Sequence, residues 1–383
     1  MKDGFAMPSS HHDHRRELLS RRGLLGRGAL LAGGLAAVPL LNACGSGGSG
    51  GSGSGSGGSG GGGGGRLVVA DWGGALQDAE KKYIFDPFSK ETGIEVAIAG
   101  PPTGAKIKAM VDTGNIEWDL IAGGPSIVLP LGRDYFEPLP DRLLNIPGID
   151  PSYADKNWLT YYLFSIVMAW NTEAMKGAKP EGWADFWDVQ KFPGKRTLRG
   201  ADQGVPPDLE FALLSAGVAP DKLYPVDVEK AFAQLGALKP NVPQWWTSGA
   251  QPGQMLVSGQ VSASSIFAGR LDALKKQGAP LDFTWNGGML QLGAWSVPKG
   301  ARNKEAAFKL IEYSVRPEVQ AAVWSKYNNG PANSKALELM DKEWASTLPS
   351  HPANAEMQFL YGADWWSKNR NEVLKRFQTF AAT

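Results

Sequence analysis

The sequence predicts an α/β fold in which mostly parallel sheets are flanked by helices. Three short segments predict strands: Leu67–Ala70, Ile94–Ile98 and Trp118–Ile121. The residues between these segments have the spacing of apolar side chains that is typical of helices. Alternation of strand and helix is typical of parallel sheets, whose ligands bind beyond the carboxyl ends of the strands. The candidate ligand-binding residues at those ends are Trp72, Gly73 and Ser126.

The elements of the first half follow in order. Apolar residues between 76 and 84 share one helical face, Asp86-Pro87 predicts the start of a further helical turn, and Thr92-Gly93 is the stop signal of that turn. Residues 105–111 predict a second helix before the third strand. The apolar run from Tyr161 to Asn171 predicts a strand long enough to leave one domain and enter another.

The second half contains a similar alternation. Residues 209–216 and the segment capped by Asp227 predict helices, and residues 261–277 predict a strand followed by a helix. Phe283 to Val297 predicts a pair of strands interrupted by Asn286-Gly287-Gly288, which returns the chain to the first domain. Further helices are expected after Asn303, from Pro317, and around residues 373–380.

The N-terminal part predicts export rather than folded structure. Its basic residues precede an apolar run at residues 29–41, and this run is too short to span a bilayer. Residues 20–25 resemble the twin-arginine export motif. Cys44, the single cysteine, closes this run and predicts lipid attachment. Residues 45–65 are only Gly and Ser and predict a flexible tether. We therefore expect an exported protein, anchored by lipid to the outer face of the cytoplasmic membrane or periplasmic.

Composition excludes several classes of function. The formal net charge is +1, and the chain beyond the basic signal is slightly acidic, so a nucleic-acid partner is not expected. Beyond the signal only His351 remains of the histidines, and with Cys44 lipidated a Ser-His-Asp or Cys-His site is improbable. We expect no metal and no cofactor, and no enzymatic activity.

An ordered set of motifs resembles the extracellular solute-binding proteins of ABC importers, and in particular the spermidine/putrescine-binding proteins. The motifs are Trp72-Gly73-Gly74, Thr92-Gly93-Ile94, Trp118-Asp119, Trp245 to Gln251, Val297 to Gly300 with Asn303 to Ala307, Arg316 to Val319, and Trp365-Trp366. The resemblance implies a two-lobed periplasmic-binding-protein type II fold with crossing hinge strands. The expected lobes are residues 66–166 with 290–383, and residues 167–289.

The resemblance also implies a ligand in the cleft between the lobes, a membrane permease as partner, and a monomeric binding protein. A polyamine requires carboxylates for its charge and aromatic faces for its methylenes. Trp72 and Phe267 occupy positions where the family stacks aromatic rings on its ligand. The other candidates that the resemblance or a neighbouring helix start indicates are Asp71, Asp208, Glu210, Ser248, Gln251, Gln291 and Asn329.

The chain departs from polyamine binders at Gly293, which stands where that group commonly has an aspartate. Leu76 and Asn329 likewise replace tyrosines of the family. A solute other than a polyamine therefore stays open as an alternative. Two further alternatives are a sensor that reports to a membrane receptor and an exported hydrolase that uses a carboxylate pair on the same fold.

Overall fold

The computed structural model describes residues 65–201 and 208–382, so that Cys44, the export signal and most of the Gly/Ser tether lie outside it. Within these described residues ten strands form one sheet, and seven of them follow the order β2-β1-β3-β8-β5-β7-β6. The strands are β1 Arg66–Ala70, β2 Glu95–Ala99, β3 Leu120–Ala122, β4 Ala154–Asp155, β5 Trp158–Asn171, β6 Arg196–Thr197, β7 Ala263–Phe267, β8 Leu281–Ser296, β9 Gly330–Pro331 and β10 Gln358–Leu360.

The sheet is mixed: parallel pairs lie at its two ends, as expected, and its antiparallel pairs all involve β5 or β8, the strands that cross between the ends. β1 pairs in parallel with β2 and β3, and β6 pairs in parallel with β7. The central pairs β3·β8, β5·β8 and β5·β7 are antiparallel. The cause is that β8 brings the chain back alongside the outgoing β5, and two neighbouring strands of opposite direction pair antiparallel.

One long strand, β8, replaces the expected strand pair around Asn286-Gly287-Gly288. Both halves of β8 pair with β5, and the register shifts where Ile166 faces Met289 and Met168 faces Thr284. Gly287 has a φ of 69°, so the extra residues form a bulge in the strand and do not reverse it. The glycine pair therefore bends β8 as it crosses between the two halves of the sheet.

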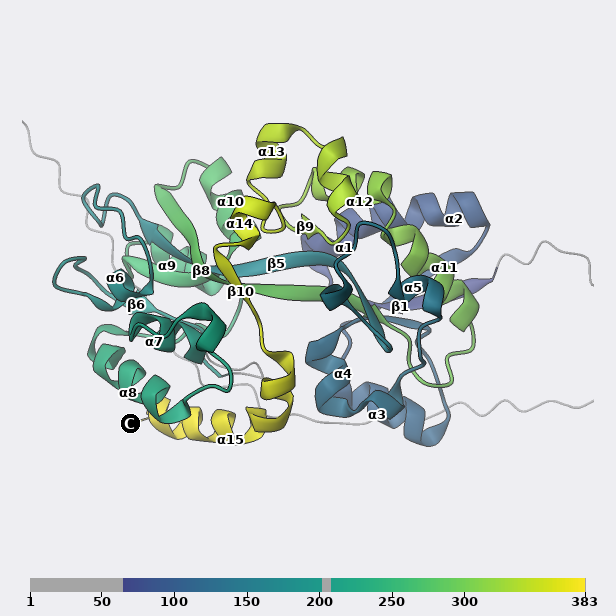
Figure 1. Ribbon diagram of the computed structural model, residues 1–383, viewed down its shortest axis with the longest axis horizontal. Coiled ribbons are helices and arrows are strands. Elements are labelled where there is room, and N and C mark those ends of the chain that lie inside the picture. The colour runs from purple at the N-terminus through teal and green to yellow at the C-terminus, as the bar shows by residue number, and fades with distance from the viewer. Residues whose placement is uncertain (1–64, 202–207, 383) are drawn as a thin grey trace, which may run out of the picture. The chain divides into compact units, whose positions relative to one another are not determined.

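Helices cover the sheet at both ends. In Figure 1, β5 and β8 run side by side across the middle, with α2 to α5 and α11 at one end and α6 to α9 at the other. The helices are α1 Gly74–Glu80, α2 Asp86–Thr92, α3 Gly104–Thr113, α4 Pro125–Leu131, α5 Asp141–Leu144, α6 Trp183–Trp187, α7 Leu209–Ser215, α8 Val228–Leu238, α9 Gln251–Val257, α10 Ala268–Lys276, α11 Lys304–Ser314, α12 Pro317–Trp324, α13 Lys342–Ser346, α14 Pro352–Ala355 and α15 Ala363–Ala382. A π-helical turn, Lys81–Phe85, joins α1 to α2.

The buried apolar side chains form three separate groups. The first core surrounds β1 and β3 and includes Leu67, Leu120 and Trp324. The second core lies around α7 and α8 and includes Phe211 and Leu235. A smaller third core, which includes Val167, Ile266 and Leu271, lies beside it, under α9 and α10. β5 contributes residues to all three, so it links the parts of the sheet.

The C-terminal segment differs from the predicted division of the chain. Phe359 on β10 and Trp366, Val373 and Phe377 on α15 are buried in the second core. The expected first lobe included all of residues 290–383, yet these side chains pack against α7 and α8 because their apolar face matches that core. α15 also contacts α4 of the first core, so this helix bridges the two.

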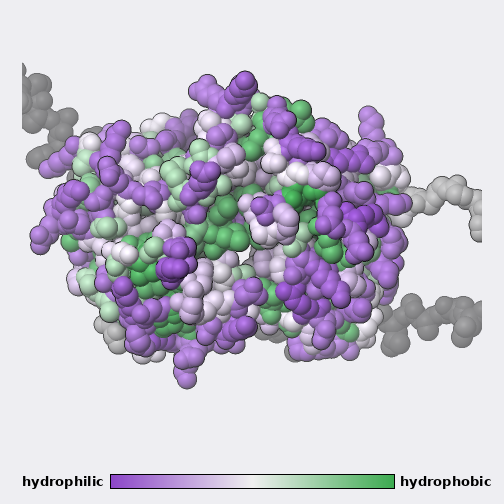
Figure 2. All heavy atoms as spheres, viewed as in Figure 1, coloured by the Kyte–Doolittle hydropathy of each residue, from purple (hydrophilic) through white to green (hydrophobic). Residues whose placement is uncertain are grey.

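On the face shown in Figure 2, apolar residues gather near the middle, over β5, β8 and β10, and polar residues surround them. Leu360 on β10 is 41% exposed. None of the helices within residues 65–201 and 208–382 has the length and apolar character needed to cross a membrane.

Candidate functional site

A cavity of about 670 Å³ is bounded by elements of both the first and the second core. The first core contributes the loop after β1, the start of α3, and α4, whereas β7, the loop after β6 and α15 belong to the second-core side. The lining residues are Trp72, Pro101, Pro102, Thr103, Gly104, Ser126, Ile127, Pro130, Leu131, Phe164, Arg199, Phe267, Gln291, Tyr361, Ala363, Trp366, Ser367 and Arg370. We call it the interlobe cavity.

Trp72 presents its indole to the interlobe cavity and is 50% exposed. It is the second residue after β1, and the next two residues, Gly73 and Gly74, have φ values of 81° and 69°. Two successive residues with positive φ turn the chain sharply into α1, and only glycine adopts this conformation without strain. Gly73 therefore acts through the backbone and does not itself line the cavity.

Arg199 contributes a positive charge to the cavity wall although the residue is only 5% exposed. Its Nε lies 3.0 Å from Oδ1 of Asp208, which is itself 1% exposed. Oδ2 of Asp208 accepts hydrogen bonds from the Arg199 amide, at 3.0 Å, and from the Ser265 hydroxyl, at 2.6 Å. Burial raises the pKa of Asp208, and Arg199 opposes that shift. Asp208, which does not itself line the cavity, thus holds the guanidinium of Arg199 in place.

Arg370 is a second cationic side chain in the cavity wall. It lies on α15, and no acidic partner is found for it among residues 65–201 and 208–382. Burial lowers the pKa of the Arg370 guanidinium, and the positive charge of Arg199 acts in the same direction. Two guanidinium groups that repel each other across one cavity form a favourable place for an anion.

Aromatic rings line another part of the wall. Phe164 on β5 and Phe267 on β7 have ring centroids 6.1 Å apart, and both line the cavity. Gln291 on β8 and Ser126 on α4 also reach the cavity and offer neutral polar groups. The cavity therefore joins two cationic groups to an apolar surface and a few uncharged hydrogen-bonding groups.

The three acids expected as counter-charges of a cationic ligand do not line the cavity. Asp71, Asp208 and Glu210 are all buried, at 0%, 1% and 0% exposure. Glu210 accepts hydrogen bonds from the hydroxyl of Tyr224 and from Nε1 of Trp366, both at 2.6 Å. Burial raises the pKa of Glu210. Glu210 thus ties α7 to α15 and supports a cavity residue, Trp366.

Of the other candidate residues from the sequence, some line the interlobe cavity and others lie outside it. Trp72, Ser126, Phe267 and Gln291 all line the cavity. Ser248 and Gln251 lie outside it, and Oε1 of Gln251 accepts a hydrogen bond from the Thr247 amide. Asn329 is 6% exposed and also lies apart from the cavity. Gln251 thus stabilises the turn that leads into α9.

Sequence reasoning missed the two arginines and Tyr361. Arg199 is two residues beyond β6, so a rule that searched every strand end would have included it. Arg370 lies in the amphipathic C-terminal helix and carries no local signal for a binding site. Tyr361 stacks on Trp366, with ring centroids 6.3 Å apart and an interplanar angle of 10°.

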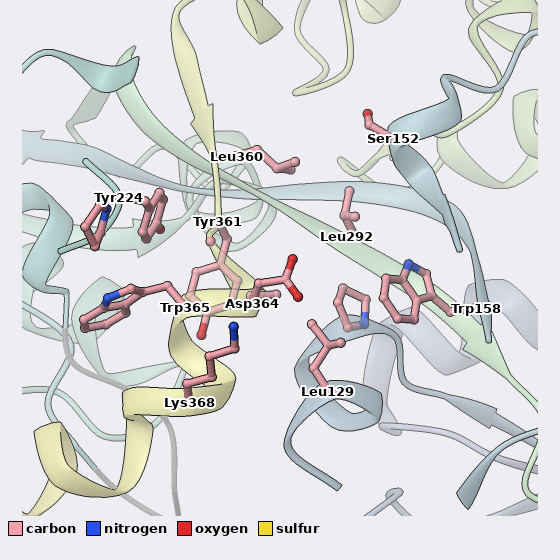
Figure 3. Close-up of a pocket in the computed structure, with 14 residues that line it drawn as sticks. Leu129, Ser152, Trp158, Tyr224, Leu292, Leu360, Tyr361, Asp364, Trp365 and Lys368 are labelled. Atoms are coloured by element: carbon pink, nitrogen blue, oxygen red, sulfur yellow. The ribbon is translucent and has the colours of Figure 1, made fainter. Parts of the chain in front are cut away.

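A second cavity, of about 560 Å³, is shown in Figure 3. It shares Tyr361 and Ala363 with the interlobe cavity. In Figure 3, Tyr361, Trp365 and Lys368 lie on one side, and Leu129, Leu292 and Trp158 on the other. This cavity contains none of the candidate residues from the sequence. We therefore take the interlobe cavity as the candidate site.

Comparison with known proteins identifies the class. Residues 83–356 match the family model of bacterial extracellular solute-binding proteins. The chain is 37% identical to the gamma-aminobutyric acid-binding protein of Pseudomonas aeruginosa, over 82% of this chain and 91% of that protein. It is 26% identical to the spermidine/putrescine-binding periplasmic protein of Escherichia coli, over 74% of this chain and 82% of that protein.

A solved structure supports the same conclusion. An ABC transporter substrate-binding protein from Bradyrhizobium japonicum shares 37% identity, with a TM-score of 0.77 over 82% of this chain and 99% of that one. The chain belongs to the bacterial extracellular solute-binding proteins. It is a substrate-binding protein of an ABC transporter for a small solute, and not an enzyme.

Proposed function

We propose that the protein binds a small solute that carries a carboxylate, with 4-aminobutanoate (GABA) as the representative ligand, and delivers it to an ABC permease. The observation that carries this proposal is the pair Arg199 and Arg370 at one cavity. Arg370 has no acidic partner among the described residues, so a ligand carboxylate would supply the missing negative charge. The name of the Pseudomonas aeruginosa relative supports the same class of ligand.

The remaining wall suits the rest of such a ligand. A short methylene chain would lie against Trp72, Phe164 and Phe267, and an ammonium group would meet an aromatic face. A polyamine, the ligand expected from the sequence, fits less well. Among the described residues no Asp or Glu lines the cavity, and each ammonium group would face repulsion from two guanidinium groups.

We further propose that the protein has two lobes, one around each of the first and second cores, which close over the ligand. The solute would contact both Arg199 on the second-core side and Trp72 on the first-core side. Such a ligand binds the closed form better than the open one and shifts the population toward it by that difference in affinity. A monomer suffices for this cycle.

Attachment to the membrane through Cys44 is also a proposal, because this cysteine lies outside the described residues. It rests on the basic and apolar sequence before Cys44 and on the Gly/Ser tether after it. The variant Cys44→Ala is expected to move the exported protein from the membrane fraction to the soluble fraction. An unchanged distribution would contradict lipid attachment.

The ligand proposal is tested with Arg370→Gln and a matched control on the same helix, Arg376→Gln. Arg376 forms a surface ion pair with Glu229, away from the interlobe cavity. A hydrogen bond to a charged group contributes roughly 1.5 to 3 kcal/mol, so Arg370→Gln should weaken 4-aminobutanoate binding about 10- to 100-fold. Calorimetric titration of both variants measures the effect. Equal affinity in the two variants would contradict the proposal.

A further inference from the structure

Two carboxyl groups, those of Asp71 and Glu80, are buried side by side behind the interlobe cavity. Asp71 directly follows β1, and Glu80 is the last residue of α1. Both residues have 0% exposure, and neither lines the cavity. Among the described residues, no lysine, arginine or histidine forms an ion pair with either carboxyl group.

The hydrogen bonds of this pair form a chain that ends at Trp72. The Tyr161 hydroxyl donates to Oε1 of Glu80. Oδ1 of Asp71 accepts a hydrogen bond of 2.6 Å from the Trp72 amide. The other oxygens, Oε2 of Glu80 and Oδ2 of Asp71, are buried and have no separate donor. The two carboxyl groups are themselves within hydrogen-bonding reach of each other.

A single proton between the two carboxyl groups accounts for this geometry. Two adjacent buried carboxylates cannot both be ionised without a large electrostatic cost, whereas one protonated group donates to the other. Burial raises the pKa of Glu80 well above its ordinary value, and the charge of Asp71 adds to that effect. Protonated Glu80 then donates from Oε2 to Oδ2 of Asp71, and every oxygen of the pair has a partner.

Few other groups that titrate face the pair. Tyr161 and Tyr162 come from β5, and Tyr327 comes from the loop after α12. Arg270 on α10 faces Tyr327. The tyrosines are neutral hydrogen-bonding groups at ordinary pH, so they do not compensate a second negative charge on the pair.

We propose that Glu80 stays protonated in the binding-competent protein and is a positioning residue for Trp72, acting through Asp71 and the Trp72 amide. This inference rests on the proposed function in so far as Trp72 contacts the solute. Loss of the proton leaves two adjacent anions with no donor between them. The end of β1 must then shift to separate them, and the indole moves with it. Binding is therefore expected to weaken at alkaline pH.

The test uses Glu80→Gln, with Glu95→Gln as the control. The glutamine amide donates to Asp71 and its oxygen accepts from Tyr161, so the chain of hydrogen bonds is kept while the titration is removed. Glu95 is exposed at the start of β2. At about pH 6, where an ordinary glutamate is ionised, the infrared band of protonated carboxyl groups should be equally strong in the wild type and Glu95→Gln, and weaker in Glu80→Gln by the contribution of Glu80. A spectrum that is the same in all three proteins would overturn the proposal.

The second readout is the pH profile of 4-aminobutanoate affinity. The ratio of the wild-type affinity to that of Glu80→Gln cancels the titration of the ligand itself. We expect this ratio to fall about tenfold as pH rises and the contribution of Glu80 to the infrared band disappears. A tenfold change corresponds to a difference of one unit between the pKa of Glu80 in the free protein and in the ligand-bound protein. The emission of Trp72, isolated by subtraction of Trp72→Phe, should change with the same midpoint. A constant ratio, or Trp72 emission that does not follow the band, would refute the positioning role.

The failure of the ligand proposal gives a different result. If the wild type releases no heat with 4-aminobutanoate, the proposed ligand class is wrong. The infrared band and the emission of Trp72 are measured without ligand, so they still decide whether Glu80 is protonated and whether it positions Trp72.

Discussion

The ring of Tyr162 lies directly against Gly293. A β-carbon at Gly293 would come within 2.1 Å of Cε1 of that ring. Tyr162 is 6% exposed, and its ring is held between Tyr161 and Trp324, at centroid distances of 4.7 and 5.1 Å. The space that a side chain at Gly293 would need is therefore occupied by an aromatic ring, and no side chain fits there without rearrangement.

Gly293→Ala is accordingly expected to destabilise the protein. Overpacking of a filled core costs roughly 1 to 3 kcal/mol in the free energy of unfolding. Gly100→Ala is the matched control, because a β-carbon there meets nothing within 4 Å. Urea unfolding of both variants measures the difference. If Gly293→Ala is as stable as Gly100→Ala, the ring of Tyr162 is free to move and an acid could be accommodated.

Trp72→Ala should weaken ligand binding and leave the fold intact. The indole is half exposed, so little of the core depends on it. Loss of its contact with the solute is expected to lower affinity about tenfold, or roughly 1.4 kcal/mol. Leu339→Ala, at a residue that is 60% exposed, controls for removal of a surface apolar group. Unchanged affinity in Trp72→Ala would remove this residue from the site.

Asp208→Asn should destabilise the protein because it leaves Arg199 buried without its counter-charge. Removal of one partner of a buried ion pair costs about 3 kcal/mol or more in the free energy of unfolding. Asp221→Asn is the control, since Asp221 forms an exposed pair with Lys222, and such pairs contribute little. Thermal and urea unfolding report both changes. Equal stability of the two variants would show that Asp208 does not hold Arg199.

The pH dependence of stability should reveal the buried carboxyl group of Glu210. Burial raises the pKa of Glu210 in the folded protein, so above the ordinary glutamate pKa of about 4.3 the folded state binds more protons than the unfolded state. Its contribution to stability is present at low pH and is lost as pH rises through the folded-state pKa.

The measurement is the free energy of unfolding against pH for the wild type and for Glu210→Gln. The wild type should lose stability relative to this variant as pH increases from about 4. The control Glu95→Gln, at an exposed residue, should run parallel to the wild type. A wild type that runs parallel to Glu210→Gln over this range would mean that the pKa of Glu210 is not raised.

Much of the fold follows from local patterns in the sequence. The apolar runs near residues 67 and 94 and the capping signals at Gly93, Asn303 and Pro317 appear in the structure close to where they are predicted. The bulge in β8 is not predicted, because the same glycine pair is compatible with a reversal of the chain. Whether the glycine pair forms a bulge or a reversal depends on how β8 pairs with β5, which lies more than 100 residues earlier in the chain.

In the candidate site, too, some residues follow from local sequence patterns and others depend on long-range packing. Trp72 and Ser126 are predicted because parallel strands present their carboxyl ends to a ligand. Arg199 and Arg370 meet only because α15 packs into the second core and bridges toward α4, which no local pattern indicates. The resemblance indicates Asp208 and Glu210 as candidates, but their burial depends on long-range packing that no local pattern reveals, and neither lines the cavity.

The most direct test of the account compares two ligands of four carbons, 4-aminobutanoate and putrescine, by isothermal titration calorimetry. They share a 3-aminopropyl part and differ at the other end, which is a carboxylate in 4-aminobutanoate and an aminomethyl cation in putrescine, so the comparison tests the charge that Arg199 and Arg370 would select. We expect 4-aminobutanoate to bind the protein spanning residues 66–383 and putrescine to give no heat. Binding of putrescine without binding of 4-aminobutanoate would contradict the assignment of the arginines as a carboxylate site.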